Sequence, residues 1–182
     1  MPAYGNHVVA LTPDLTAVLD AQSPGIESTG DYDFGPAPML FQPNGCPPLA
    51  AANNKNGTLY IWDRTRLSSG PIAVIPVGDG VSAFVGTPAW SEDQQTLYSA
   101  QAVLFGAKGR LGNGVRAFRV QRGCRFVQAW ANPLGDGNQA TPLVVGSDVL
   151  FATGGTPAAS TGSPPRPAES SGSSQRPVGP SR

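Results

Sequence analysis

The stretch that decides the fold is residues 53–64, with the sequence NNKNGTLYIWDR. Asn56-Gly57 predicts a tight hairpin with a type I′ turn, because both central residues of that turn need a positive φ. An apolar run, Leu49–Ala52, precedes the turn. Thr58–Asp63, rich in β-branched and aromatic residues, follows it. The stretch therefore predicts two antiparallel strands joined by a short turn.

The same pattern recurs before and after this stretch. Leu59, Ile61 and Trp62 have apolar counterparts 51 residues earlier and 56 residues later, at Val8, Ala10, Leu11 and at Val115, Ala117, Phe118. A second landmark, a proline just before an apolar run, occurs at positions 38, 88 and 142. Two landmarks that repeat in step predict a blade-type β-repeat with about four short strands in each unit.

The repeat divides the chain into two complete four-stranded units and two partial ones. The expected strands are 7–11 and 16–19, then 38–42, 49–52, 58–63 and 72–76, then 87–91, 96–103, 115–120 and 126–130, then 142–145 and 149–153. Asn113-Gly114 is expected at a hairpin turn like Asn56-Gly57. The large aromatic residues are expected to lie mostly in the cores between units: Tyr60, Trp62, Trp90, Phe118 and Trp130.

The composition suits this architecture and narrows the function. The chain of 182 residues has 23 glycines and 19 prolines, which suits many short strands joined by tight turns. Its formal net charge is zero, so nothing indicates nucleic-acid binding. The longest apolar runs are far too short to span a bilayer. Met1–Gly5 has neither a basic nor an apolar leader region. We therefore expect no signal peptide, and we interpret the chain either as a fragment or as the product of a misplaced start codon.

The repeat stops near residue 155. Residues 156–182 consist mainly of proline, glycine and serine and contain no aromatic residue. Such a segment cannot bury enough apolar surface to offset the entropy lost on ordering. The sequence therefore predicts a repeat domain over 1–155 and a disordered, dispensable tail over 156–182.

At these residues the sequence resembles the pyrroloquinoline-quinone-like (PQQ-like) β-propeller repeat. The resemblance rests on Lys55-Asn56-Gly57-x-Leu59-Tyr60-x-x-Asp63-Arg64 and on Ala117-Phe118-Arg119 followed by Gly123 and Trp130. It implies an all-β fold of four-stranded antiparallel blades in an incomplete propeller. The repeat-defining structural residues are then Gly57, Tyr60, Trp62, Asp63, Ala117, Phe118, Gly123 and Trp130.

Three functions are compatible with such repeats. The first is a non-catalytic binding or scaffold module, in which missing blades or another protein cover the open ends, or the chain self-associates. The resemblance implies that this module belongs to a periplasmic, cell-envelope or secreted protein. The second is a fragment of a PQQ-dependent quinoprotein alcohol dehydrogenase, with PQQ and Ca²⁺ as cofactors. The third is a WD40-like interaction propeller, suggested by Trp62-Asp63, although the period of 50–56 residues exceeds the ~40–45 of that family.

The sequence assigns no catalytic residue, no metal ligand and no cofactor-binding residue. The quinoprotein dehydrogenases hold their cofactor against an adjacent cysteine pair, whereas Cys46 and Cys124 are 78 residues apart here. Those two cysteines form either a disulfide between the two complete units or two unrelated thiols, and their spacing does not decide between these readings.

Arginines are concentrated between residues 110 and 125, at Arg110, Arg116, Arg119, Arg122 and Arg125. Because residues 116 and 119 point to opposite faces of a strand, we do not expect one continuous basic patch. We interpret these arginines as solvated strand and turn residues rather than as an anion site.

Overall fold

The computed structural model describes residues 4–26, 32–78, 86–101, 114–132, 141–145 and 149–153, which form twelve strands and one short 3₁₀ helix. The first sheet contains β1 (Val8–Leu11) and β2 (Val18–Gln22). The second contains β3 (Met39–Phe41), β4 (Leu49–Asn54), β5 (Thr58–Asp63) and β6 (Ala73–Pro76), with η1 (Leu67–Ser69) between the last two. The third contains β7 (Ala89–Ser91), β8 (Thr96–Gln101), β9 (Gly114–Gln121) and β10 (Arg125–Asn132). The fourth contains β11 (Thr141–Val145) and β12 (Val149–Thr153).

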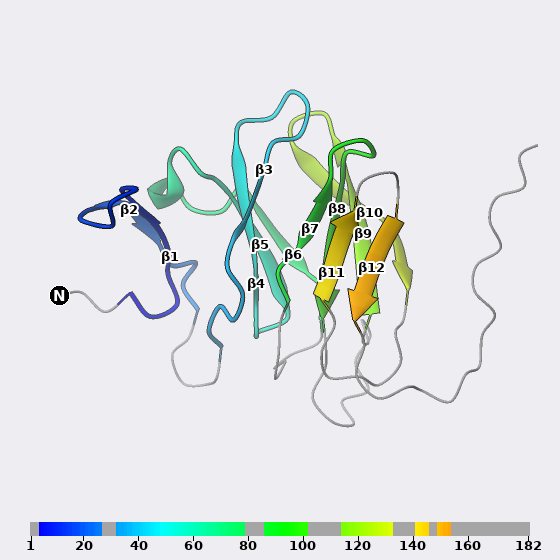
Figure 1. The fold of residues 1–182 in the computed structure, drawn as a ribbon, viewed down its shortest axis with the longest axis horizontal. Coiled ribbons are helices and arrows are strands. Elements are labelled where there is room, and N and C mark those ends of the chain that lie inside the picture. Colours follow the sequence, from blue (N-terminus) through cyan, green and yellow to red (C-terminus); the bar gives the residue numbers. More distant parts are fainter. Residues whose placement is uncertain are drawn as a thin grey trace, which may run out of the picture.

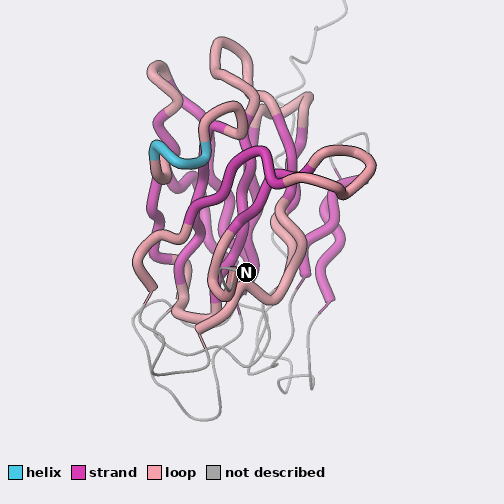
Figure 2. Tube along the Cα trace, turned by 90° about the vertical axis from the view of Figure 1, so that its left-hand side faces the viewer, coloured by secondary structure: helices cyan, strands magenta, loops and turns pink. Residues whose placement is uncertain are grey.

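Every sheet is an antiparallel meander in which neighbouring strands follow one another along the chain. The four sheets stand in a row in sequence order, from β1–β2 at one end to β11–β12 at the other (Figure 1). Figure 2 views this row from the side of the first sheet, where η1 is the one helical segment among the described residues. The sequence-based prediction of an all-β chain of antiparallel strands is confirmed.

The hairpin at Asn56-Gly57 forms, but its turn differs from the prediction. Strand β4 continues to Asn54 instead of ending at Ala52, so three residues connect it to β5. Gly57 has a φ of +83°, whereas Asn56 does not have a positive φ. The N–H of Gly57 donates to the carbonyl of Asn54 at 3.1 Å. This is a type I turn followed by a left-handed glycine, the usual solution for a three-residue loop.

The second expected hairpin turn is also different. Gly114 is the first residue of β9 and pairs with Gln101 of β8, so it belongs to the strand and not to the turn. Asn113 lies outside the described residues. The C-terminal tail expected at residues 156–182, and the domain boundary before it, also lie outside them.

Alternation along each strand sends one set of side chains to each neighbouring sheet. In β5, Leu59 and Ile61 join the core between the second and third sheets, and Tyr60 and Trp62 join the core against the first sheet. The core between the second and third sheets contains Phe41, Leu49, Ala51, Leu97 and Phe118. The smaller core against the fourth sheet contains Ala89, Tyr98, Ala100, Val115 and Ala117, with Leu150 packed on it.

The expected burial of the large aromatic residues is confirmed only in part. Tyr60, Trp62 and Phe118 are buried and Trp90 is half-buried, but the side chain of Trp130 is 42% exposed. Trp130 lies on β10, the outer strand of the third sheet, next to a register shift. The fourth sheet contacts this sheet mainly through β11, which lies against β7 and β8, and also through Leu150 of β12. Its two strands therefore leave the Trp130 end of the face uncovered.

Candidate functional site

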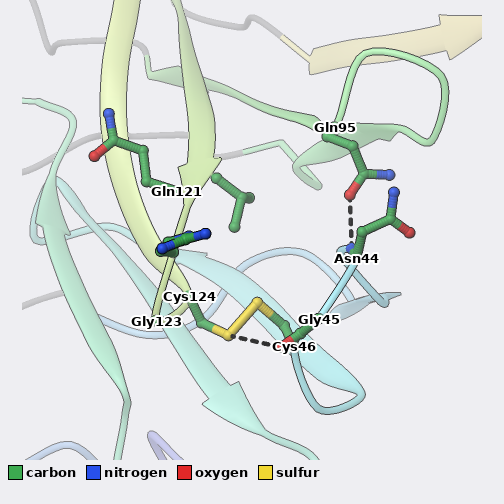
Figure 3. A pocket seen from close by; sticks show the side chains of 9 residues that line it. Asn44, Gly45, Cys46, Gln95, Gln121, Gly123 and Cys124 are labelled. Carbon is green, nitrogen blue, oxygen red and sulfur yellow. Dashed lines mark hydrogen bonds between the residues drawn. A yellow bond between two sulfur atoms is a disulfide. The ribbon is translucent and has the colours of Figure 1, made fainter.

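The candidate site lies where the second and third sheets are cross-linked. Cys46, in the connection between β3 and β4, forms a disulfide with Cys124 of the β9–β10 turn, with a Cα–Cα distance of 5.7 Å. This is the first of the two readings that the sequence left open. Figure 3 shows the disulfide at the rim of a hollow between the two sheets.

The turn that carries Cys124 has an unusual backbone. Gly123 has a φ of +74° and Cys124 itself a φ of +56°, which few residues other than glycine adopt. On the opposite wall, the N–H of Asn44 donates to Oε1 of Gln95 at 2.7 Å (Figure 3). Gln95 also has a positive φ, of +48°. The disulfide and this hydrogen bond together tie the β3–β4 connection of the second sheet to two turns of the third sheet, β9–β10 and β7–β8.

Two hollows flank the β9–β10 turn, and Arg122, Gly123 and Cys124 line both. The first, of about 290 Å³, also reaches Asn44 and Gln95. The second, of about 390 Å³, lies between this turn and residues 72–75. β6 is the edge strand of the second sheet. Four consecutive residues, 72–75, line the second hollow, so the free edge of β6 faces this hollow.

The lining of the second hollow is apolar and basic. Ile72 and Val74 are 43% and 55% exposed, and Arg122 and Arg125 are exposed beside them. Among the residues that the structure describes, no acidic side chain lines either hollow. The Arg125 guanidinium donates to Oε1 of Gln121 at 2.7 Å, which holds it beside the turn. The second hollow, which we call the β6 groove, therefore combines a strand edge, exposed aliphatic side chains and two cations.

The arginines are distributed differently from the expectation in one respect. Arg119, Arg122 and Arg125 are exposed, as expected, but Arg116 is only 3% exposed. Arg116 pairs with Ser99 across β8–β9 and lies on the strand face that meets the second sheet. It occupies the place in the repeat that Tyr60 has one unit earlier, which is a buried place. The prediction that Arg116 is solvated is therefore wrong. Arg110 lies outside the described residues.

The repeat-defining residues have structural roles in the described parts of the chain: they pack in cores, form hydrogen bonds or shape turns. The indole N–H of Trp62 donates to Oε1 of Gln22 in β2 at 2.7 Å. The Asp63 carboxylate accepts hydrogen bonds from the Thr65 hydroxyl and N–H, and these hold the pKa of Asp63 below its ordinary value. Ala117 is fully buried, and Gly57 and Gly123 provide left-handed turn residues.

Two polar residues of β2 dock the first sheet, and sequence reasoning missed both. That reasoning ended the second strand at residue 19, whereas β2 runs to Gln22. The Asp20 carboxylate accepts the Ser68 N–H of η1 at 3.1 and 3.2 Å to its two oxygens, which lowers the pKa of Asp20. Gln22 is the partner of Trp62. The only signal in the sequence was that polar residues alternate with Leu19 and Ala21.

Among the described residues, no three histidine, cysteine, aspartate or glutamate side chains are grouped so that they could hold a metal ion. Asp33 forms a salt bridge with Lys55 at 2.8 Å. No helix in the described ranges is long and apolar enough to cross a membrane.

Comparison with known proteins adds no relatives. We find no family model that matches the sequence, and no significant match among curated proteins or solved structures.

Proposed function

We propose that this chain is a non-catalytic binding or scaffold module built from PQQ-like β-propeller repeats. The observation that carries the proposal is the face-to-face stack of two complete four-stranded meanders, whose strands recur with the sequence period of 50–56 residues. Blades of a propeller are four-stranded antiparallel sheets that pack on one another in this way.

The disulfide supports an exported or cell-envelope location. Disulfides persist in oxidising compartments and are rare where thiol buffers keep cysteines reduced. Cys46 and Cys124 join two different sheets, so the bond restrains the stack and is not confined to one loop.

The β6 groove is the surface through which we propose that the module binds. An edge strand can accept an extended peptide as an additional strand, and exposed aliphatic side chains beside the edge provide apolar contacts. Arg122 and Arg125 favour a peptide with acidic residues, because none of the described residues that line the groove is acidic. The proposed ligand is therefore an extended acidic segment of a partner protein.

Fluorescence anisotropy with labelled peptides tests this proposal. An alternating valine–glutamate peptide should bind, with an affinity that falls as salt rises, and a valine–lysine peptide of the same length should not. The double variant Arg122→Glu/Arg125→Glu should lose most of this binding. Arg119→Glu is the matched control, because Arg119 is exposed on the same hairpin but does not line the groove. Equal affinity of the control and the double variant would contradict the assignment.

A separate assay addresses the quinoprotein alternative. The chain is incubated with PQQ and Ca²⁺, and dye-linked oxidation of alcohols is measured against the cofactors alone. The non-catalytic proposal expects no rate above that background. A reproducible rate that depends on the protein would overturn it in favour of the dehydrogenase reading.

A further inference from the structure

The first and last sheets of the row are complementary halves. In each complete sheet the second strand pairs with the third: β4 pairs with β5, and β8 pairs with β9. In the repeat, β1 corresponds to the third strand, because Val8, Ala10 and Leu11 correspond to Leu59, Ile61 and Trp62. β11 and β12 correspond to the first and second strands, because β11 follows Ala140-Thr141-Pro142 as β7 follows Gly86-Thr87-Pro88. β12 is therefore a second strand and β1 a third strand. Among the described residues, these two strands lack the pairing that joins the second and third strands of a complete sheet.

The exposed apolar side chains lie where these half-sheets leave their neighbours uncovered. Leu40 of β3 is 60% exposed, on the face of the second sheet that packs against the two strands of the first. Trp130 is 42% exposed, on the face of the third sheet that packs against the two strands of the fourth. A complete four-stranded sheet at each of these places would cover both side chains.

The first sheet also has an apolar outer face. Val8 and Ala10 point toward the second sheet, so Val9 and Leu11 point away from it. Leu11, Val18 and Leu19 are 46%, 44% and 66% exposed. Both complete sheets bury apolar side chains on two faces, whereas the first sheet does so on one. The outer face of the first sheet is therefore apolar, like the faces of the complete sheets that pack on a neighbouring sheet.

We propose that β12 of one copy of this chain pairs antiparallel with β1 of a second copy. The four strands β11-β12-β1-β2 then form one composite sheet that has the strand order of the two complete sheets. In this arrangement the outer face of β1–β2 covers Trp130 of the first copy, and β11 of the first copy covers Leu40 of the second. The occupant of the open face is thus a second copy, because this chain itself supplies the missing half.

The register of the composite pairing follows from the two complete sheets. Leu40 pairs with Ala50, Trp90 with Leu97 and Val144 with Leu150, at equivalent places in three sheets. Ala50 then pairs with Trp62, and Leu97 with Phe118. Leu11 is the counterpart of Trp62 and Phe118. Both complete sheets therefore place Leu150 of one copy opposite Leu11 of the other, and Ala152 opposite Val9.

Two copies joined head to tail at both ends form a ring of six four-stranded sheets, within the four to eight that propellers contain. This closed ring rests on the propeller proposed above, whereas the β12–β1 pairing rests on strand order alone. The peptide-binding and PQQ assays do not depend on the pairing, so failure of one proposal is distinguishable from failure of the other.

Cysteine cross-linking tests the register directly. The variant Val9→Cys is mixed with Ala152→Cys under mild oxidation and run on a non-reducing gel. Opposite residues on paired antiparallel strands have Cβ atoms ~4.5–5.5 Å apart, close enough for a disulfide to form. We expect a covalent dimer from the mixture, in clear excess over either variant alone. In the control mixture, Asp93→Cys replaces Val9→Cys, because Asp93 is exposed in the β7–β8 connection and lies in neither the proposed pairing nor the β6 groove. Equal cross-linking in the control would overturn the register.

Sedimentation velocity over a wide range of concentrations tests the association itself. The chain should sediment as a dimer, and Leu19→Lys should shift it to a monomer with an unchanged circular dichroism spectrum, because Leu19 is 66% exposed within one copy. Asp93→Lys, at an exposed position of the β7–β8 connection, should remain dimeric. Dimer formation should also shift tryptophan emission to shorter wavelength as Trp130 becomes covered. A wild-type monomer at all concentrations would overturn the proposal, as would an association that Leu19→Lys leaves unchanged.

Discussion

Ser99 in β8 donates its hydroxyl proton to Oδ1 of Asn53 in β4 at 2.8 Å, and both side chains are fully buried between the second and third sheets. The Nδ2 of Asn53 donates to the carbonyl of Gly86 at 2.9 Å. One amide therefore connects β4 to β8 and to the segment that leads into β7. Because the side chains of Asn53 and Ser99 are fully buried, these hydrogen bonds fix the position of the second sheet relative to the third.

Replacing Asn53 should be costly for this reason. Asn53→Ala leaves the fully buried Ser99 hydroxyl without its partner, and a buried unsatisfied group costs about 1–3 kcal/mol. It also removes the hydrogen bond to the carbonyl of the half-buried Gly86. We expect a clearly lower free energy of unfolding in urea. The double variant Asn53→Ala/Ser99→Ala should lose less than the sum of the two single variants, because it no longer buries an unpaired hydroxyl. Strict additivity would contradict the hydrogen bond.

The disulfide should stabilise the stack while Cys124 itself is strained. Cys124→Ser and Cys46→Ser each remove the cross-link, which we expect to lower the free energy of unfolding by about 2–4 kcal/mol. Cys124→Gly removes the same bond but relieves the left-handed backbone at a φ of +56°, worth about 1 kcal/mol. It should therefore unfold at a higher urea concentration than Cys124→Ser. The reverse order would show that the turn does not keep this conformation.

The strand positions could be predicted because the repeat provides several independent copies of the same signal. Pro38, Pro88 and Pro142 each mark the start of a unit, and the strands begin within three residues of the positions that this period indicates. The burial of Arg116 could not be predicted in the same way. Alternation indicates which face of β9 the residue lies on, but not that the second sheet covers this face at the position of Arg116.

The docking of the first sheet was missed for a related reason. Asp20 and Gln22 are polar, and a polar residue at a strand end is typical of a connecting segment. What keeps β2 extended is the pair of acceptors that it offers to the Ser68 N–H and the Trp62 indole, 48 and 40 residues away in sequence. The candidate site depends in the same way on contacts between turns of different sheets, which a single sequence does not contain.

Protonation of Asp20 should loosen this docking at low pH. The pKa of Asp20 is lowered by the backbone N–H of Ser68, so its contribution to stability is complete above the unfolded-state value of about 3.9. It is lost as the pH falls through the lower folded-state pKa. Asp20→Asn should therefore reduce stability at neutral pH and flatten its decline below about pH 4. Urea midpoints measured against pH will report this.

Asp93→Asn is the control for the acid experiment, because it removes the same charge from a residue that is exposed in the β7–β8 connection. At neutral pH its urea midpoint should stay close to that of the wild type, because the Asp93 side chain is exposed. If the decline of Asp20→Asn over the acid range is as steep as that of the wild type, the carboxylate of Asp20 does not carry the contact with η1.

Substitution of Gly57, the glycine of the β4–β5 hairpin, should lower the stability of the chain. At a φ of +83° an added Cβ is strained, and we expect Gly57→Ala to destabilise the chain by about 1 kcal/mol. Gly57→Asn should recover part of this loss, because asparagine tolerates the left-handed region better than alanine does. Gly5→Ala is the control: Gly5 has no positive φ, and no atom lies within 4 Å of its added Cβ. Thermal unfolding of the three variants should rank Gly5→Ala first, Gly57→Asn second and Gly57→Ala last. A Gly57→Ala variant as stable as Gly5→Ala would mean that β4 and β5 are connected by a different turn.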